Sequence, residues 1–193
     1  MISAIILAAG QSRRMGQPKM LLPWGKFTVI EHVIITFLNS GIKEITVVTG
    51  GARQQVENTI AQYPVQRVYN DAYASSEMLS SLQRGLRATS PETQATLIGL
   101  GDQPQVQERS VHLICEEYRA SQSALVVPSF QRRRGHPWLV ARPLWKEILA
   151  LRPAESLRDF LNTHADDIQY VEVDTPSILS DLDTPEDYQQ ARP

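Results

Sequence analysis

The chain has 193 residues, of which 42% are hydrophobic and 21% are charged, a balance typical of a globular rather than a disordered protein. Its 19 basic and 21 acidic residues give a net charge of -2, which argues against a nucleic-acid partner because a binding surface for one needs a clear basic excess. The single cysteine, Cys115, excludes an intrachain disulfide. We expect its thiol to be a small buried apolar group in a cytoplasmic protein.

The chain begins with an apolar run over residues 2–9. A membrane-spanning helix needs about 20 such residues, so this run is too short to cross a bilayer. Arg13 and Arg14 follow the run, whereas a signal peptide carries its basic residues in front. We therefore predict a buried first strand here and no membrane partner.

Strand-like and helix-like segments alternate along the first two thirds of the chain. Thr28 and Glu31 form a possible capping box at the start of the first helix, and Gly41 follows as a stop signal. Such alternation predicts an α/β fold in which a mostly parallel sheet carries helices on both faces. The predicted strands cover residues 4–8, 44–49, 65–69, 95–100 and 124–128, and the predicted helices cover residues 28–40, 54–62, 79–88 and 111–118.

The pattern changes after residue 128. The predicted strands are now residues 138–141 and 168–173, the predicted helices are residues 144–151 and 157–161, and these can add an edge or an antiparallel strand to the same sheet. A last helix begins at Thr184, which can cap it, with Pro185 in its first turn and two acidic residues following. Since no linker or change of composition divides the chain, we expect a single domain over residues 1–193.

Ligands of open parallel sheets bind beyond the carboxyl ends of the strands. The first candidate segment there is residues 7–19, which contains Gly10, Gly16, Arg14 and Lys19. Glycines allow backbone N–H groups to approach a phosphate, and the cations neutralise its charge. The spacing matches neither the P-loop nor the dinucleotide fingerprint, so a surface turn with solvated charges remains the alternative.

Two acidic segments are the other candidates. Asp102 follows the fourth strand, where its carboxylate could ligate Mg²⁺ or begin a turn before Pro104. Asp181 and Asp183 are two residues apart, so on an extended segment both face the same side and both could approach a metal ion. Alternatively, one of them ligates and the other caps, or both belong to a helix start.

Four segments follow one another along the chain: LAAGQSRRMGQPK at residues 7–19, GDQP at 101–104, RGHP at 134–137 and DLDTPEDY at 181–188. In this order they resemble the motifs of the MobA-like nucleotidyltransferases and, within them, of the molybdenum cofactor cytidylyltransferase type. The resemblance covers essentially the whole chain and implies a Rossmann-like three-layer nucleotidyltransferase fold. The GTP-using branch typically reads LAGG in the first segment, so Ala9 favours CTP.

The resemblance also implies a reaction and a site. The terminal phosphate of molybdopterin or molybdenum cofactor attacks the α-phosphorus of CTP (or GTP), the nucleoside monophosphate is transferred, and pyrophosphate leaves. Lys19, Arg14 and Asp102 are the implied catalytic residues, and Asp102 with Asp183 is implied to hold Mg²⁺. Arg134, Gly135 and His136 are implied to bind the acceptor, and a molybdenum hydroxylase could receive the product. The implied nucleotide-binding residues are Leu7, Ala8, Ala9, Gly10, Ser12, Arg14, Gly16, Lys19, Asn70, Ser81 and Gly101.

The chain departs from the family pattern at Glu77, where the family has glycine. Because this residue adds bulk and negative charge near the expected nucleotide, it could change the selectivity for the base and lower the activity. Trp138 stands where a small aliphatic residue is usual, and its ring could stack on a pterin or fill the core. His136 could touch the acceptor or be structural. Two other functions remain open: nucleotidyl transfer to a different phosphate acceptor, and a non-catalytic accessory protein that binds molybdenum cofactor for a hydroxylase.

Overall fold

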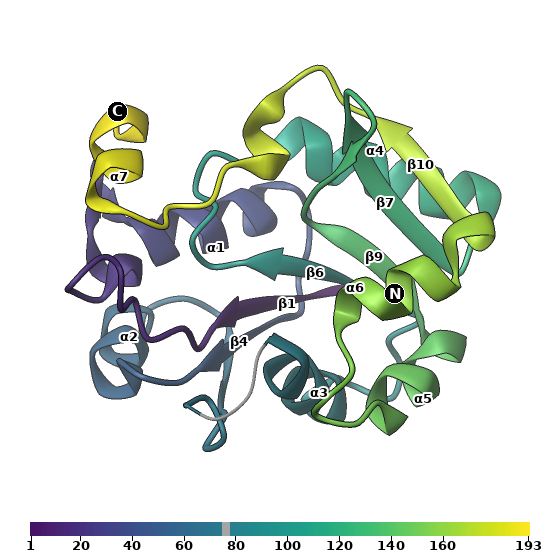
Figure 1. The fold of residues 1–193 in the computed structure, drawn as a ribbon, viewed down its shortest axis with the longest axis horizontal. Coiled ribbons are helices and arrows are strands. Elements are labelled where there is room, and N and C mark those ends of the chain that lie inside the picture. The colour runs from purple at the N-terminus through teal and green to yellow at the C-terminus, as the bar shows by residue number, and fades with distance from the viewer. Residues whose placement is uncertain (75–77) are drawn as a thin grey trace.

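A computed structural model describes residues 1–74 and 78–193. Its centre is an eight-stranded sheet (Figure 1) in the order β10-β7-β9-β6-β1-β4-β5, with β8 paired to β7. The strands are β1 (Ile2–Ala8), β4 (Ile45–Thr49), β5 (Gln66–Tyr69), β6 (Ala95–Leu100), β7 (Leu125–Phe130), β8 (Arg133–Arg134), β9 (Trp138–Ala141) and β10 (Ile168–Glu172). The expectation at Glu77 lies outside the described residues.

Helices cover both faces of this sheet, as the alternating pattern predicts. One apolar core packs beneath α1 (Val29–Asn39), α2 (Arg53–Thr59) and α4 (Glu108–Ser121). A second core packs beneath α3 (Met78–Ala88), α5 (Arg142–Ala150) and α6 (Leu157–Thr163) on the other face (Figure 1). Within β1, Ile6 belongs to the first core and Ile5 to the second. An uninterrupted apolar strand is what a central strand buried on both faces requires.

The region after residue 128 adds both kinds of strand to the sheet. β9 is antiparallel to its two neighbours, β6 and β7, and lies inside the sheet, whereas β10 forms the edge and runs parallel to β7. Because β9 runs against the others, the residues that precede it lie at the edge where the parallel strands end. The RGHP segment at residues 134–137 is thereby brought to the side of the sheet where ligands bind.

Local signals at two helix starts are confirmed. Thr28 and Glu31 form the predicted capping box, in which the Thr28 N–H donates to Glu31 Oε2 at 2.8 Å. Thr184 caps α7 (Pro185–Ala191) by accepting from the Asp187 N–H at 3.2 Å, and Pro185 occupies the first turn. Several short elements were not predicted: the strands β2 (Pro23–Trp24), β3 (Phe27–Thr28) and β8, and the 3-10 helices η1 (Lys19–Leu21), η2 (Ala165–Asp167) and η3 (Pro176–Leu179).

Two side chains with more than one possible role belong to the interior. Cys115 is 2% exposed in the first core, and burial raises the pKa of its thiol to about 11, so it is a packing group rather than a reactive one. Trp138 is also 2% exposed and stacks on Phe160, with 6.5 Å between the ring centroids. Its ring therefore packs in the second core, and the same residue also lines a cavity of about 990 Å³. Among the described residues, no helix has the length and apolar character needed to cross a membrane.

Candidate active site

The loop after β1 is folded around Ser12, which has a positive φ of 51°. The carbonyl oxygen of Ser12 accepts hydrogen bonds from the N–H groups of Met15 and Gly16, both at 3.1 Å. Its hydroxyl accepts from the backbone N–H of Lys19, also at 3.1 Å. Gly16 has a φ of 71°, a conformation that glycine adopts without steric cost. These bonds bring Lys19 back beneath the carboxyl ends of the central strands.

Lys19 is the centre of an ion-pair cluster. Its side-chain Nζ contacts a carboxylate oxygen of Asp102 and lies 3.2 Å from Oδ1 of Asp183. The other oxygen of Asp183 pairs with Nη2 of Arg14 at 2.8 Å. Three segments that are remote in the sequence therefore meet at one ammonium group. The cluster contains every residue that the resemblance implies for catalysis and metal binding.

The surroundings keep Lys19 charged. Burial of this side chain, which is 8% exposed, lowers the pKa of its ammonium, but the charges of and hydrogen bonds to Asp102 and Asp183 outweigh burial and raise the pKa. The pKa of Asp181 is raised, first by burial and then by the negative charge of Asp102. In this cluster the carboxylates, which are those of Asp102, Asp181 and Asp183, outnumber the cations, which are Lys19 and Arg14.

The segment that carries the last two aspartates is tied to the end of β6. The Leu182 N–H donates to the carbonyl oxygen of Asp102 at 3.1 Å. The amide of Gln103 donates to Oδ1 of Asp181 at 2.7 Å. Asp181 and Asp183 therefore have different partners: one contacts Gln103 and the other contacts Lys19. Neither carboxylate caps α7, because the N-cap of this helix is Thr184, whose hydroxyl accepts from the Asp187 N–H.

Asp102 and Asp183 form a donor set that suits a hard divalent cation. Both carboxylates already approach a single positive charge, the Lys19 ammonium. Mg²⁺ is typically held by one or two carboxylates, with water and substrate phosphate oxygens completing its coordination. Across residues 1–74 and 78–193, no group of three or more His, Cys, Asp or Glu side chains is arranged to hold a metal. The residues thus fit a cation shared with a phosphorylated substrate.

A cavity of about 260 Å³ opens beside Lys19. It is bounded by the first loop on one side and by α3 on the other. Its lining consists of Leu7, Ala9, Gly10, Lys19, Met20, Tyr73, Met78, Ser81, Leu100 and Asp102. Five of the predicted nucleotide-binding residues lie here, and Tyr73 is an aromatic ring that no sequence motif had marked.

The other predicted nucleotide-binding residues take supporting positions. Ala8 belongs to the apolar core, and Gly101 lies in close contact with Met20 and Ala8. Asn70 is fully buried, and its side-chain amide donates to the hydroxyls of Ser80 and Ser81 at 2.8 and 2.9 Å. It therefore holds the start of α3, from which Ser81 reaches the cavity. Ser12 and Gly16 line a neighbouring hollow that Tyr73 also borders. Arg14 is not part of the lining of either space, and its side chain pairs with Asp183.

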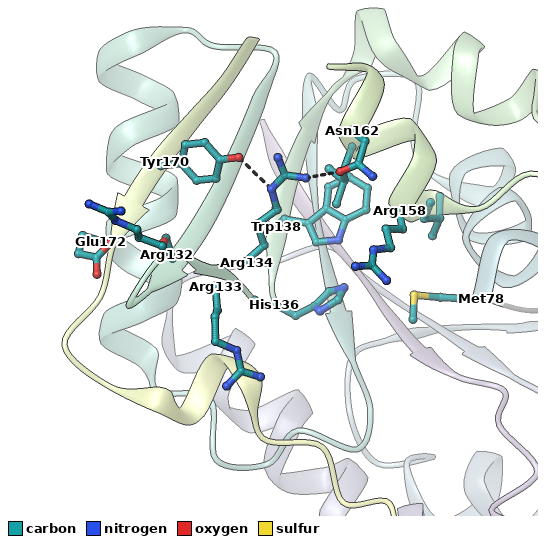
Figure 2. A pocket seen from close by; sticks show the side chains of 14 residues that line it. Met78, Arg132, Arg133, Arg134, His136, Trp138, Arg158, Asn162, Tyr170 and Glu172 are labelled. Carbon is teal, nitrogen blue, oxygen red and sulfur yellow. Dashed lines mark hydrogen bonds between the residues drawn. The ribbon is translucent and has the colours of Figure 1, made fainter. Parts of the chain in front are cut away.

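A second cavity, of about 990 Å³, lies beside the first. Met78 lines both. The segment before β9 supplies Arg134, Gly135 and His136 to its wall, and Figure 2 shows the side chains of Arg134 and His136 there. These are the three residues that the resemblance implies for the acceptor. Figure 2 also shows Arg158 reaching in from α6, on the side where Met78 lies. Arg158 is outside all four motifs, and the single sequence carries no signal that would have marked it.

Gly135 and His136 are fixed by backbone contacts to β7 and η3. The Gly135 N–H donates to the carbonyl oxygen of Pro128, and the His136 N–H donates to that of Ile178, both at 3.0 Å. A Cβ atom added at Gly135 would lie 2.5 Å from the Ile178 carbonyl oxygen. Burial lowers the pKa of His136 to about 4, so its ring is neutral at pH 7. The wall of the second cavity therefore depends on a close backbone approach that only glycine allows.

Comparisons with known sequences agree with this geometry. The family model described as a MobA-like NTP transferase domain matches residues 4–168 of the chain. The molybdenum cofactor cytidylyltransferase of Escherichia coli is 28% identical over 192 residues, which cover 99% of this chain and 95% of that protein. The nicotine blue oxidoreductase of Paenarthrobacter nicotinovorans is 29% identical over 193 residues, covering 96% of this chain and 93% of that protein.

Solved structures confirm the predicted fold class. Rv0371c from Mycobacterium tuberculosis has a TM-score of 0.86 at 26% identity, covering 98% of this chain and 96% of that chain. A nucleotidyl transferase from Methanothermobacter thermautotrophicus has a TM-score of 0.85 at 29% identity, covering 100% of this chain and 96% of that chain. A complex of Rv0371c with manganese has a TM-score of 0.82 at 25% identity, covering 98% of this chain and 96% of that chain.

The close approach at Gly135 predicts a stability effect. Gly135→Ala should lower the free energy of unfolding by about 1–3 kcal/mol, because the new methyl group meets backbone that cannot move cheaply. Gly10→Ala is the matched control, since a Cβ there has no heavy atom within 4 Å. Urea unfolding of the two variants measures the difference. Equal stability of both would contradict the packing described at Ile178.

The neutral ring of His136 predicts a pH effect on stability. Between about pH 6.5 and 4 the unfolded chain binds a proton at this position that the folded chain does not, so acidification through this window favours unfolding. From pH 7 to pH 5 the free energy of unfolding of His136→Gln should therefore fall by roughly 1–2 kcal/mol less than that of the wild type. His112→Gln, an exposed site on α4, should fall as the wild type does. Identical losses in all three proteins would refute the burial effect.

Proposed function

The chain belongs to the MobA-like NTP transferase family, and from that premise we propose that it transfers CMP from CTP to the terminal phosphate of molybdopterin or molybdenum cofactor. The observation that carries the proposal is the position of Lys19 between Asp102 and Asp183, at the mouth of a cavity that adjoins a second one at Met78. The 28% identity to a molybdenum cofactor cytidylyltransferase over 99% of the chain supports the choice of acceptor. Ala9, in the LAAG sequence, supports CTP rather than GTP.

The residues of the first cavity would hold the triphosphate. Lys19 and Arg14 supply positive charge, and the backbone of the loop around Gly10 lines the space where the base and ribose would lie. Asp102 and Asp183 would hold Mg²⁺, which when bound neutralises phosphate charge. Positioning and charge neutralisation account for most of the catalysis of phosphoryl transfer, so a protein nucleophile is unnecessary.

The second cavity would hold the acceptor. Its arginines can pair with a phosphate through charge-assisted hydrogen bonds, and Met78 marks where the two substrates would meet. An oxygen of the acceptor phosphate forms a bond to the α-phosphorus of CTP while the bond from that phosphorus to the bridging oxygen breaks, and pyrophosphate leaves. The product would pass to a molybdenum hydroxylase.

Two other candidates make distinct demands on the site. Transfer to a different phosphate acceptor would use the same first cavity and differ only in the second. A non-catalytic accessory protein would bind the cofactor without needing the Lys19 cluster, and the intact contacts of Lys19 to both aspartates therefore argue against it. The chain is also 29% identical to an oxidoreductase over 96% of its length. Nucleotidyl transfer is therefore tested directly, by measuring the release of pyrophosphate.

Pyrophosphate release is the test of the proposed reaction. Each of the four ribonucleoside triphosphates is incubated with the protein and Mg²⁺, with and without molybdenum cofactor. We expect release with CTP that depends on the cofactor and is at least about 10-fold faster than with GTP, the difference of roughly 1.4 kcal/mol that one good polar contact supplies. No release with any nucleotide, despite binding of the cofactor, would favour the accessory protein.

Asp102 is the residue whose loss should be most damaging to turnover. Asp102→Asn should lower kcat/KM for CTP by about 100-fold or more, because it removes the carboxylate shared by Lys19 and the proposed cation. Asp166→Asn, in exposed η2, is the control and should retain full activity. Circular dichroism checks that both variants are folded. Unchanged turnover of folded Asp102→Asn would exclude Asp102 as a metal ligand.

A further inference from the structure

Four arginines line the second cavity, and none of them forms an ion pair with a described residue. They are Arg132, Arg133, Arg134 and Arg158. Within the described part of the chain, the ion pairs involve other basic residues and none of these four. Among the described residues of the lining, Glu172 is the one carboxylate, and it accepts from the Gln131 N–H at 3.2 Å. The cavity therefore carries a strong excess of positive charge.

Arg134 differs from the others because its guanidinium is held in place. Its Nε donates to the Tyr170 hydroxyl at 2.8 Å, and its Nη1 donates to Oδ1 of Asn162 at 2.9 Å. The guanidinium carbon also lies 5.7 Å from the centre of the Tyr170 ring. Figure 2 shows the group suspended between these two side chains, which come from β10 and α6. Three elements therefore converge to orient one cation.

Both partners of Arg134 are electrically neutral. A phenol and an amide oxygen direct a guanidinium without cancelling its charge, whereas a carboxylate would do both. Arg134 retains further N–H groups beyond the two used in these bonds, so it can still bind an anion. A pre-oriented charged group binds more tightly than a mobile one because less conformational entropy is lost when the ligand arrives.

We infer that Tyr170 and Asn162 are positioning residues that hold Arg134, fully charged, to receive the anionic group of the acceptor. This inference rests on the proposed function for the identity of the acceptor, but the holding of Arg134 rests on the geometry alone. Tyr170 is 42% exposed at the edge of the sheet, where neither packing nor a ladder bond requires a phenol. Both residues lie outside the four motifs. Their hydrogen bonds to Arg134 give both residues the role of orienting its guanidinium.

Steady-state kinetics test the functional half of the inference. Tyr170→Phe and Asn162→Ala should each raise the KM for molybdenum cofactor about 10-fold and change the KM for CTP less than about 2-fold. Asn162→Asp keeps an oxygen that accepts the hydrogen bond from Arg134 but neutralises the positive charge of its guanidinium. This variant should raise the KM for molybdenum cofactor further than Asn162→Ala. Asp174→Asn is the control, because it breaks the nearby surface pair with Arg109 without touching the cavity. Equal effects on both substrates, or full acceptor affinity in Asn162→Asp, would overturn the inference.

Chemical labelling tests the holding of Arg134 without any turnover. Phenylglyoxal modifies accessible guanidinium groups, and peptide mass mapping in the presence of saturating CTP gives the rate at Arg134. The rate should rise several-fold in Tyr170→Phe and Asn162→Ala and stay at the wild-type value in Asp174→Asn. An unchanged rate in the first two variants would refute the positioning. A labelling shift in a protein that transfers no CMP would refute the proposed function and leave the positioning of Arg134 standing.

Discussion

The arrangement of the active-site edge depends on the burial of one ammonium group between two carboxylates. Lys19 is 8% exposed, and a buried charge of this kind is tolerated only when it is paired. Its partners, Asp102 and Asp183, come from the end of β6 and from the segment before α7. The pairing therefore joins the first loop, the centre of the sheet and the C-terminal segment. A substrate that carries phosphates and a cation can replace these contacts without leaving any charge unpaired.

The direction of β9 determines what lies opposite this cluster. An antiparallel strand inside a parallel sheet presents its beginning, rather than its end, at the ligand-binding edge. Residues 134–137 are therefore at the same edge as Asp102, although they precede a strand instead of following one. This reversal lets a single sheet edge carry two adjoining cavities, with Met78 between them. A reaction that joins two phosphorylated molecules requires such a pair of adjacent sites.

Much of this edge was predictable, and the reasons are local. The apolar run of β1, the capping boxes at Thr28 and Thr184, and the motif residues Lys19 and Asp102 are all readable from short stretches of sequence. The supporting contacts were not predictable, because each depends on how the chain folds between its two residues. Nothing in the sequence near Asn70 shows that its amide holds Ser81, 11 residues later. The approach of Gly135 to the carbonyl oxygen of Ile178 joins residues that are far apart in the sequence, and it depends on a strand order that a single sequence leaves open.

The cations of the two cavities differ in the charge of their hydrogen-bond partners. At the first, carboxylates pair with Lys19, which lines the cavity, and with Arg14 outside it, so positive charge is compensated before any ligand arrives. In the second, the hydrogen-bond partners of Arg134 among the described residues are neutral, so its guanidinium keeps its attraction for an anion. In the proposed reaction, a cation-bound triphosphate would exchange with the ion pairs of the first cavity, whereas an acceptor phosphate that arrives without its own cation would need the positive charge of the second. The different partners would thus favour different ligands on the two sides of Met78, as the proposed transfer from donor to acceptor requires.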